Sequence, residues 1–250
     1  MADNLYVAWQ DEVSRTWHTI ARLTRDSEGF ELIFTQGATR LGDLPERLFG
    51  MQLKYRYRFE KLIHLFKNKI PSRNRPDFEK MARWLNLSGS EDEFALLSKF
   101  GLIPGSDALL VYPAPTIVDS KYEIEFFVHG IRHMQPDVLK LCENDLEPGE
   151  RLLPVLDVQN PVDPHAVLLR CESNPILVGY VPTFYAADLK HILSNEALCA
   201  SARITVLRNN KDAPIQLRLL CRFESAVLPG FQPLDSIVHK PALELQAAQS

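Results

Sequence analysis

Hydrophobic and polar positions alternate along the first 36 residues of the chain. Three stretches show the alternation, LYVAWQ (5–10), TWHTIARLT (16–24) and GFELIFTQ (29–36), and the polar segments DEVSR and RDSEG separate them. A two-residue period is typical of strands with one buried face, and polar residues between such strands favour tight turns. The pattern therefore predicts an antiparallel β-meander.

The period lengthens beyond residue 57, which predicts helices. Four apolar residues fit one face of a first helix: Phe59, Leu62, Ile63 and Phe66. The segment 70–78 breaks this helix, and residues 77–87 predict a second one with Pro76 at its first turn. Residues 90–101 (SEDEFALLSKFG) predict a third helix, with Ser90 and Glu93 as a capping box and Gly101 as the C-cap.

A proline-rich stretch at 113–120 predicts a domain boundary, because the pattern starts afresh beyond it. We expect strands over 122–131, 151–158, 166–171, 176–181, 201–208 and 215–223. We expect helices over 135–145 and 183–193, the latter capped by Thr183. Short strands in the order β-α-β-β-β-α-β-β predict a small barrel. The fold class is α+β, with domains 1–115 and 116–228 and a partly frayed extension at 229–250.

Composition narrows the class of protein. Hydrophobic residues make up 46% and charged residues 24%, as in soluble globular proteins, and no apolar run is long enough to span a membrane. The first residues have no apolar core of a secretory signal, so we expect a cytoplasmic protein. Four widely spaced cysteines (142, 171, 199 and 221) predict reduced, mostly buried thiols. A four-thiolate zinc site stays open as an alternative.

The charge is unevenly distributed. Residues 54–83 contain ten Lys or Arg and three acids, so this basic segment carries +7 and leaves −11 for the rest of a chain whose net charge is −4. Such a segment is either a set of solvated helix faces or a surface that binds nucleic acid. We predict seven DNA-binding side chains in it: Lys54, Arg56, Arg58, Lys67, Lys69, Arg73 and Arg75.

The stretch NPVDPHAV (160–167) combines two prolines with Asn160 and Asp163, whose short side chains can bond to nearby backbone. An apolar strand follows at once, and VGYVP (178–182) comes shortly afterwards. The two polar side chains either only fix the turn or also contact a ligand. Metal binding by His129 and His133 is disfavoured, because four-residue spacing brings ligands together on a helix and these residues end a strand.

Residues 122–224 resemble the HIRAN domain family in three elements, FFVHGIRH, LDVQNPVDPHAVLL and VGYVP. The resemblance implies an OB-like barrel, and characterised eukaryotic members bind the 3′ end of single-stranded DNA. It implies that DNA is contacted by Arg132, His133, Asn160, Asp163, His165 and Tyr180. In this scheme Asp163 accepts a hydrogen bond from a terminal 3′-hydroxyl, and Tyr180 stacks on a base or donates to phosphate. Val162 stands where the DNA-binding members have an aromatic residue, and His133 replaces another.

Residues 5–113 resemble the N-terminal subdomain of HipA-type kinases in TWHTIARLT, GFELIFTQGA and DEFALLSKFGLIPGSDALLVYPAP, among other segments. That subdomain is not catalytic, and the sequence has neither a glycine-rich phosphate loop nor the catalytic motifs of a kinase. If this subdomain binds a protein partner, the apolar residues Trp9, Trp17 and Phe49 would be partly exposed, and packing in the core is the alternative for each of them. A nuclease site assembled from Asp157, Asp163, Glu172 and Lys140 is the enzymatic alternative.

We therefore expect a non-enzymatic, bacterial DNA-binding accessory protein that recognises single strands or 3′ ends, in DNA repair or phage defence, without cofactor, metal or membrane. The alternative is an antitoxin-like regulatory partner of a HipA-like kinase or of a defence enzyme. Homo-oligomers are compatible with either function.

Overall fold

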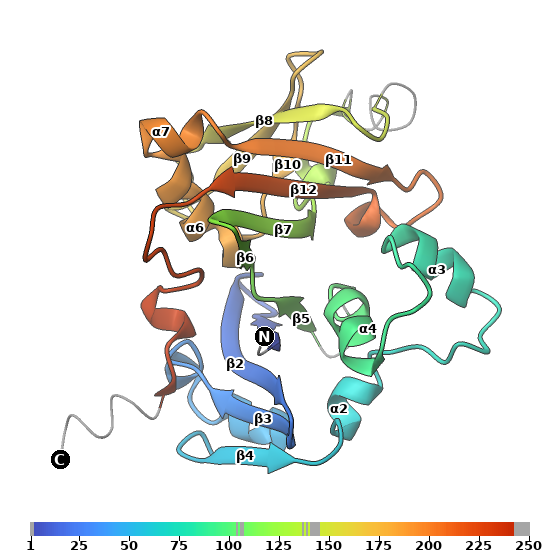
Figure 1. Cartoon of the computed structure of the whole chain (residues 1–250), viewed down its shortest axis with the longest axis vertical. Helices are drawn as coiled ribbons and strands as arrows, with labels where there is room; N and C mark the ends of the chain where they lie inside the picture. Colours follow the sequence, from blue (N-terminus) through green and yellow to red (C-terminus); the bar gives the residue numbers. More distant parts are fainter. Residues whose placement is uncertain are drawn as a thin grey trace. The chain divides into compact units, whose positions relative to one another are not determined.

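The computed structural model describes residues 3–103, 105, 108–136, 138, 140 and 146–242 (Figure 1). The chain divides into two compact units. The first contains residues 1–79, 87–114 and 235–250, and the second contains residues 80–86 and 115–234. The chain thus passes from the first unit to the second near residue 115. The expected C-terminal extension begins at residue 229, and its residues up to 234 belong to the second unit while those from 235 belong to the first.

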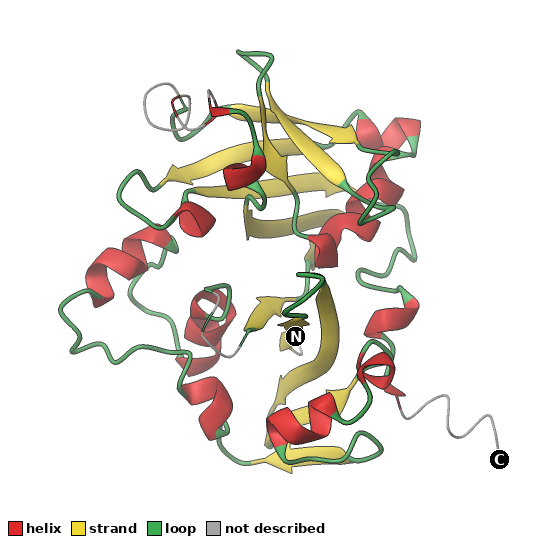
Figure 2. Ribbon diagram, turned by 180° about the vertical axis from the view of Figure 1, so that it is seen from behind, coloured by secondary structure: helices red, strands yellow, loops and turns green. Residues whose placement is uncertain are grey.

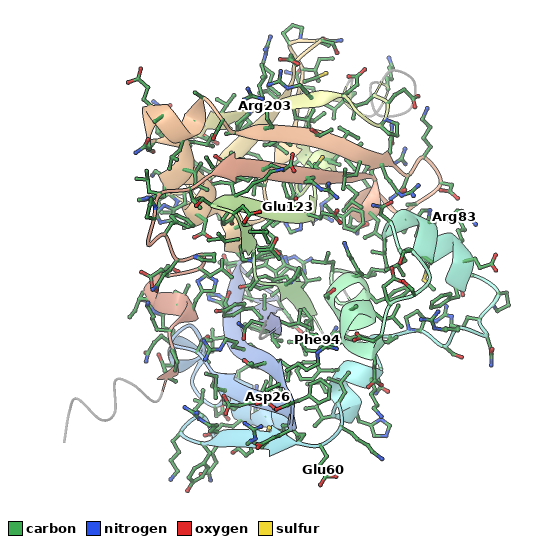
Figure 3. The ribbon with its side chains drawn as sticks, in the orientation of Figure 1. Asp26, Glu60, Arg83, Phe94, Glu123 and Arg203 are labelled. Atoms are coloured by element: carbon green, nitrogen blue, oxygen red, sulfur yellow. The ribbon has the colours of Figure 1, made fainter. Side chains whose placement is uncertain are left out.

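The first unit is built on a five-stranded antiparallel sheet in the order β4-β3-β2-β1-β5 (Figure 1). Its strands are β1 (Asp3–Gln10), β2 (Trp17–Asp26), β3 (Gly29–Phe34), β4 (Arg56–Phe59) and β5 (Leu109–Pro113). The predicted meander is confirmed as β1 to β3. Its buried positions, among them Leu5, Val7 and Ile20, join the apolar side of α4 in one core. Phe94 of α4 stacks on Phe30, with ring centroids 5.9 Å apart (Figure 3).

Short helices and the C-terminal segment complete the first unit. They are η1 (Ala38–Leu41), α1 (Leu44–Phe49), α2 (His64–Lys67), α4 (Glu93–Phe100) and η4 (Ile237–His239), while α3 (Phe78–Trp84) runs across the division between units. Backbone bonds from Gln36 to Lys240 (2.8 Å) and from Gly37 to Val238 (3.2 Å) hold the C-terminal segment against the turn that follows β3. The expected frayed end from residue 243 onward lies outside the described residues.

Three helix predictions need correction. Phe59 is the last residue of β4, where it pairs with Phe30, so pairing between strands overrides the helical period and α2 begins only at His64. Asp92, not Ser90, caps α4, because its carboxylate accepts from the N–H of Ala95 at 2.8 Å. Thr183 is the first residue of its helix, and the cap position belongs to Pro182 without a side-chain bond.

The second unit is a seven-stranded antiparallel sheet in the order β10-β9-β8-β11-β12-β7-β6. Its strands are β6 (Thr116–Val118), β7 (Lys121–Phe127), β8 (Arg151–Leu156), β9 (Val167–Cys171), β10 (Leu177–Tyr180), β11 (Arg203–Asn209) and β12 (Leu219–Ala226). The helical elements are η2 (Ile131–His133), α6 (Thr183–Leu193), α7 (Glu196–Cys199) and η3 (Ile215–Leu217) (Figure 2). The expected linker contains β6, and most of the expected helix at 135–145 lies outside the described residues.

The sheet curls so that β10, at one end, meets the segment that follows β7, the last strand but one. His129, which follows β7, forms a two-way backbone bridge with Tyr180 at the end of β10, through N···O distances of 2.9 and 2.8 Å. The bridge joins opposite sides of the strand order and closes the sheet into a small barrel. Closure requires close backbone approach at Gly179, where an added Cβ would lie 2.5 Å from the carbonyl oxygen of His129. The glycine of the VGYVP element therefore makes the closure possible.

Candidate nucleic-acid interface

Asp157 lies at the centre of the hydrogen bonds around the turn that follows β8. Its Oδ2 accepts from the Tyr180 hydroxyl at 3.0 Å and from the Asn160 side-chain amide at 3.0 Å. These bonds, led by the one from Asn160, hold the pKa of Asp157 below its usual value. Burial, with the bond to Asp157, raises the pKa of Tyr180. Asp157 thus joins the turn to the closing strand of the barrel.

Residues 160–165 form a turn fixed by its own side chains. Asn160 Oδ1 accepts from the backbone N–H groups of Val162 and Asp163, both at 3.0 Å. Asp163 Oδ1 accepts from the N–H of His165 at 2.8 Å. Both the amide NH₂ and the Oδ1 of Asn160 therefore make hydrogen bonds that hold the turn. Asp163 Oδ2, in contrast, accepts no hydrogen bond from the described part of the chain.

Arg132 and His133 lie in η2, just beyond the point of closure. Both are exposed, and the Arg132 Nε donates to His133 Nε2 at 3.0 Å. The preceding Gly130 lies against the Tyr180 ring, since an added Cβ there would be 3.4 Å from Tyr180 Cδ2. In the described chain no carboxylate pairs with the Arg132 guanidinium, which leaves its charge available to an anion.

The structure thus brings Asn160, Asp163 and Tyr180 together around Asp157. Arg132 follows two residues after Gly130, which lies against the Tyr180 ring. Tyr180 is half-buried and its hydroxyl already donates to Asp157, so its expected donation to phosphate would require breaking that bond. The DNA-binding residues predicted from the sequence do not include Asp157. Its position at a strand end, three residues before Asn160, is the signal that indicates it.

The surface of this turn is apolar as well as polar. Val158 is 76% exposed and Val162 is 73% exposed. An exposed valine can contact a nucleotide base but offers no aromatic face for stacking, which is worth about 1–3 kcal/mol per base. This face of the protein therefore presents exposed apolar side chains and has no aromatic ring at position 162.

Most side chains of the basic segment make contacts within their own unit. Arg56 pairs with Glu31, Arg58 with Asp26 and Glu28, Lys67 with Glu93, and Arg75 with Asp77. Asp26, labelled in Figure 3, is the last residue of β2. Lys69 donates to the Leu109 carbonyl. Lys54 stacks on Tyr55, and Arg73 donates to the carbonyls of Gly89 and Glu91. The charges of Lys54 and Arg73 are therefore not offset by a carboxylate within the described chain.

The candidate nuclease residues do not share a site. Asp157 faces Ala166 at one end of β9, whereas Glu172 follows the other end and pairs with Arg151 at 3.3 Å. Six residues of extended chain place Ala166 and Glu172 roughly 20 Å apart. Lys140 is exposed.

Within the described residues, no group of three potential ligands could hold a metal ion. Cys171 and Cys221 are buried and Cys199 is exposed, which agrees with the prediction of mostly buried thiols, and Cys142 lies outside the described residues. In the same part of the chain, no helix combines the length and apolar character needed to cross a membrane.

Comparison with known proteins finds a match within the second unit. Residues 121–227 match the family model of the HIRAN domain, which supports the predicted HIRAN-like domain in this part of the chain. The crystal structure of the HIRAN domain of human HLTF is similar at 16% identity with a TM-score of 0.33, covering 41% of this chain and 74% of that chain. No curated protein matches the sequence. The resemblance of residues 5–113 to HipA-type kinases stays a prediction.

Proposed function

We propose that this protein is a non-enzymatic DNA-binding protein that recognises the 3′ end of a single strand through its HIRAN domain. The observation that carries the proposal is the fixed turn, which presents one unengaged carboxylate oxygen on Asp163. A carboxylate repels phosphate but accepts a hydrogen bond from a hydroxyl, and a strand end is where DNA offers one. Because the turn is already ordered, little entropy is lost on binding.

The positive charge that such a site needs comes from Arg132. A guanidinium can hold a phosphate by two parallel hydrogen bonds, and Arg132 has no competing carboxylate within the described residues. Asp163 then selects the terminal hydroxyl and Arg132 attracts the phosphate before it. Tyr180 supports both, because its ring lies against Gly130 and its hydroxyl bonds the turn through Asp157.

Replacement of Asp163 tests the proposal. Asp163→Ala should weaken binding to strands with a 3′-hydroxyl by about 1–3 kcal/mol, which is the usual effect of losing a charged hydrogen-bond partner. Strands ending in a 3′-phosphate should bind the variant as well as the parent or better, because a repulsive charge is gone. Fluorescence anisotropy with 3′-hydroxyl, 3′-phosphate and circular strands measures this difference.

The matched control is Glu172→Ala, which removes a carboxylate at the opposite end of β9. It should leave the preference for a 3′-hydroxyl unchanged. If the parent protein binds hydroxyl ends, phosphate ends and circles equally well, Asp163 is only a turn residue and the proposed recognition of ends is wrong.

We propose that the basic segment adds electrostatic affinity through its carboxylate-free cations. The double variant Lys54→Gln/Arg73→Gln should lower the slope of log K against log salt by up to about 1.4, at roughly 0.7 per phosphate neutralised on a single strand. The control Arg58→Gln/Arg75→Gln removes cations that are already paired with carboxylates. Equal slopes for the parent and both variants would show that the segment is a solvated surface.

A protein partner for the first unit is the second candidate function. The observation that favours it is Tyr55, which is 51% exposed just before the edge strand β4. Trp9, Trp17 and Phe49 are half-buried, and Phe49 packs edge-on against Phe34. We propose a HipA-like kinase or a defence enzyme as the partner. Affinity purification of the parent and of Tyr55→Ala from the native host tests this, and equal recovery of partners by both would count against this surface.

A further inference from the structure

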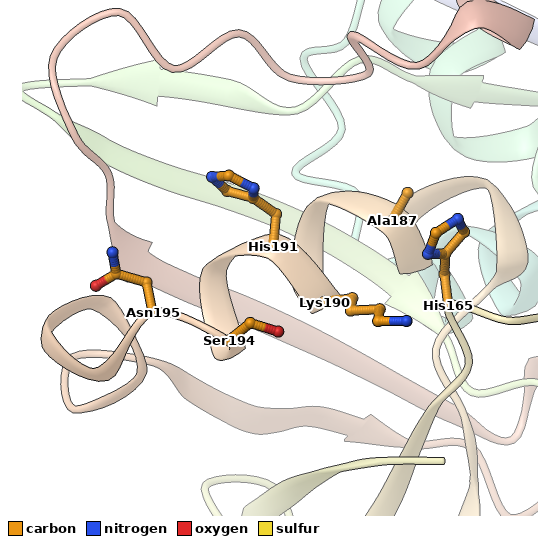
Figure 4. Close-up of a pocket in the computed structure, with 6 residues that line it drawn as sticks. All are labelled: His165, Ala187, Lys190, His191, Ser194 and Asn195. Carbon is orange, nitrogen blue, oxygen red and sulfur yellow. The ribbon is translucent and has the colours of Figure 1, made fainter. Parts of the chain in front are cut away.

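A shallow pocket lies along one side of α6 in the second unit. Its volume is about 510 Å³, and it is lined by His165, Ala187, Lys190, His191, Ser194 and Asn195 (Figure 4). Four of these residues recur on one helix face, at positions 187, 190, 191 and 194, which spans about 10 Å along the axis. His165 comes from the turn that carries Asp163.

The polar groups of this pocket suit an anion. None of its six lining residues is acidic. Asn195 uses its Oδ1 to accept from the N–H groups of Ala197 and Leu198, so its amide NH₂ is the group left to donate. The single acid of α6, Asp188, is buried, where it accepts from Tyr122 and from the N–H of Leu234. The lining thus offers donors and positive charge.

Lys190 connects this pocket to the proposed DNA site. Its Nζ donates to the carbonyl of Pro164 at 2.7 Å, next to Asp163 in the turn. Figure 4 shows the Lys190 side chain extending toward His165. An ammonium has three N–H groups, and no carboxylate in the described chain pairs with this one, so two donors remain for a ligand.

We propose that this pocket binds a backbone phosphate of the same DNA strand whose 3′ end lies at Asp163. The inference rests on the proposed function and adds a path for the strand, from the turn onto α6. The pocket is longer than one phosphate group and open on the surface, which fits a passing strand better than a free ion. Lys190 provides the main charge, and His191 and the amide of Asn195 provide further donors.

The test pairs a protein change with a change in the DNA. Lys190→Gln keeps a donor for the Pro164 carbonyl but removes the charge, and it should weaken binding of a short 3′-hydroxyl strand roughly threefold to tenfold at low salt. The salt slope should fall by about 0.7. In the DNA, each phosphate linkage in turn is replaced by an uncharged methylphosphonate. At one linkage this replacement should weaken binding by the parent protein, and at that linkage it should not further weaken binding by Lys190→Gln. The control Lys211→Gln removes a cation paired with Glu147 outside the pocket.

The outcomes separate this inference from the proposed function. A preference for 3′-hydroxyl over 3′-phosphate that persists in Lys190→Gln, together with the lost methylphosphonate effect, supports the pocket. In the contrary outcome, the preference for a 3′-hydroxyl persists while every methylphosphonate weakens binding by the parent and by Lys190→Gln equally. That result would overturn the proposed phosphate site in the pocket and leave the proposed function standing. Failure of the parent to bind any single strand overturns both.

Discussion

Gly179→Ala is expected to destabilise the second unit by about 3 kcal/mol. Gly179 has φ of +149°, which L-residues rarely adopt, and an added Cβ would lie 2.5 Å from the His129 carbonyl oxygen and 2.6 Å from Val128 Cγ1. The positive φ and the overlap with fixed neighbours each cost about 1–3 kcal/mol. The backbone at the closing bridge must move, so the barrel opens where the proposed DNA site is held.

Gly149→Ala is the matched control for this variant. Gly149 also has a positive φ, +96°, but no atom lies within 4 Å of an added Cβ. Alanine at position 149 therefore has the strained backbone conformation but no steric overlap with neighbouring atoms. Urea unfolding of both variants, with hydrogen exchange of residues 177–181 and 127–131 as a local readout, measures the difference. Equal destabilisation by the two substitutions would mean that the close approach at the bridge does not limit stability.

The parts of the fold that sequence predicted well are those that depend on local pattern. The strands β1 to β3 follow from strict alternation, and the hairpin of β9 and β10 follows from two apolar runs around a polar turn. Phe59 was misassigned because its helical spacing says nothing about the strand β3 that pairs with it. The bridge between His129 and Tyr180 joins residues 51 positions apart, which no local pattern encodes.

The candidate site divides in the same way. The turn chemistry of Asn160 and Asp163 is local and could be predicted from residue type, and the structure shows both side chains bonding the backbone of residues 162–165. The bond from Tyr180 to Asp157 depends on the closed barrel, so Asp157 was missed. The positive charge of Arg58 is offset by the carboxylates of Asp26 and Glu28, which come near it only because the strands of the sheet are paired. A count of charges along the chain therefore could not reveal these ion pairs.

Acidification from pH 7 to pH 5 is expected to destabilise each unit by about 2 kcal/mol, because each unit contains one histidine whose pKa is lowered in the folded protein. Burial lowers the pKa of His239 in the first unit and of His129 in the second, each from 6.5 to about 4. His239 is 6% exposed and contacts Tyr112 and Ser236, and His129 packs edge-on against Phe184. In both places the folded protein favours the neutral ring.

The sign follows from proton binding. The unfolded chain takes up a proton near pH 6.5 and the folded chain only near pH 4, so the stability is complete above about 6.5 and is lost as the pH falls toward 4. The loss reaches about 2 kcal/mol per histidine at pH 5 and about 3 kcal/mol at pH 4. Asp92 and Asp157, whose pKa values are lowered from 3.8, lose their bonds at lower pH, so the histidines dominate between pH 7 and 5.

Urea unfolding at pH 7 and 5, resolved by hydrogen exchange for each unit, measures the effect. His239→Gln should flatten the pH dependence of the first unit alone, and His129→Gln that of the second, even though each variant is less stable at pH 7. His64→Gln changes an exposed histidine and should preserve the parent profile. Because the His129 backbone forms the closing bridge with Tyr180, the proposed DNA binding should weaken as the second unit loses stability at lower pH. A parent profile that is flat from pH 7 to 5 would show that neither ring is held neutral by burial.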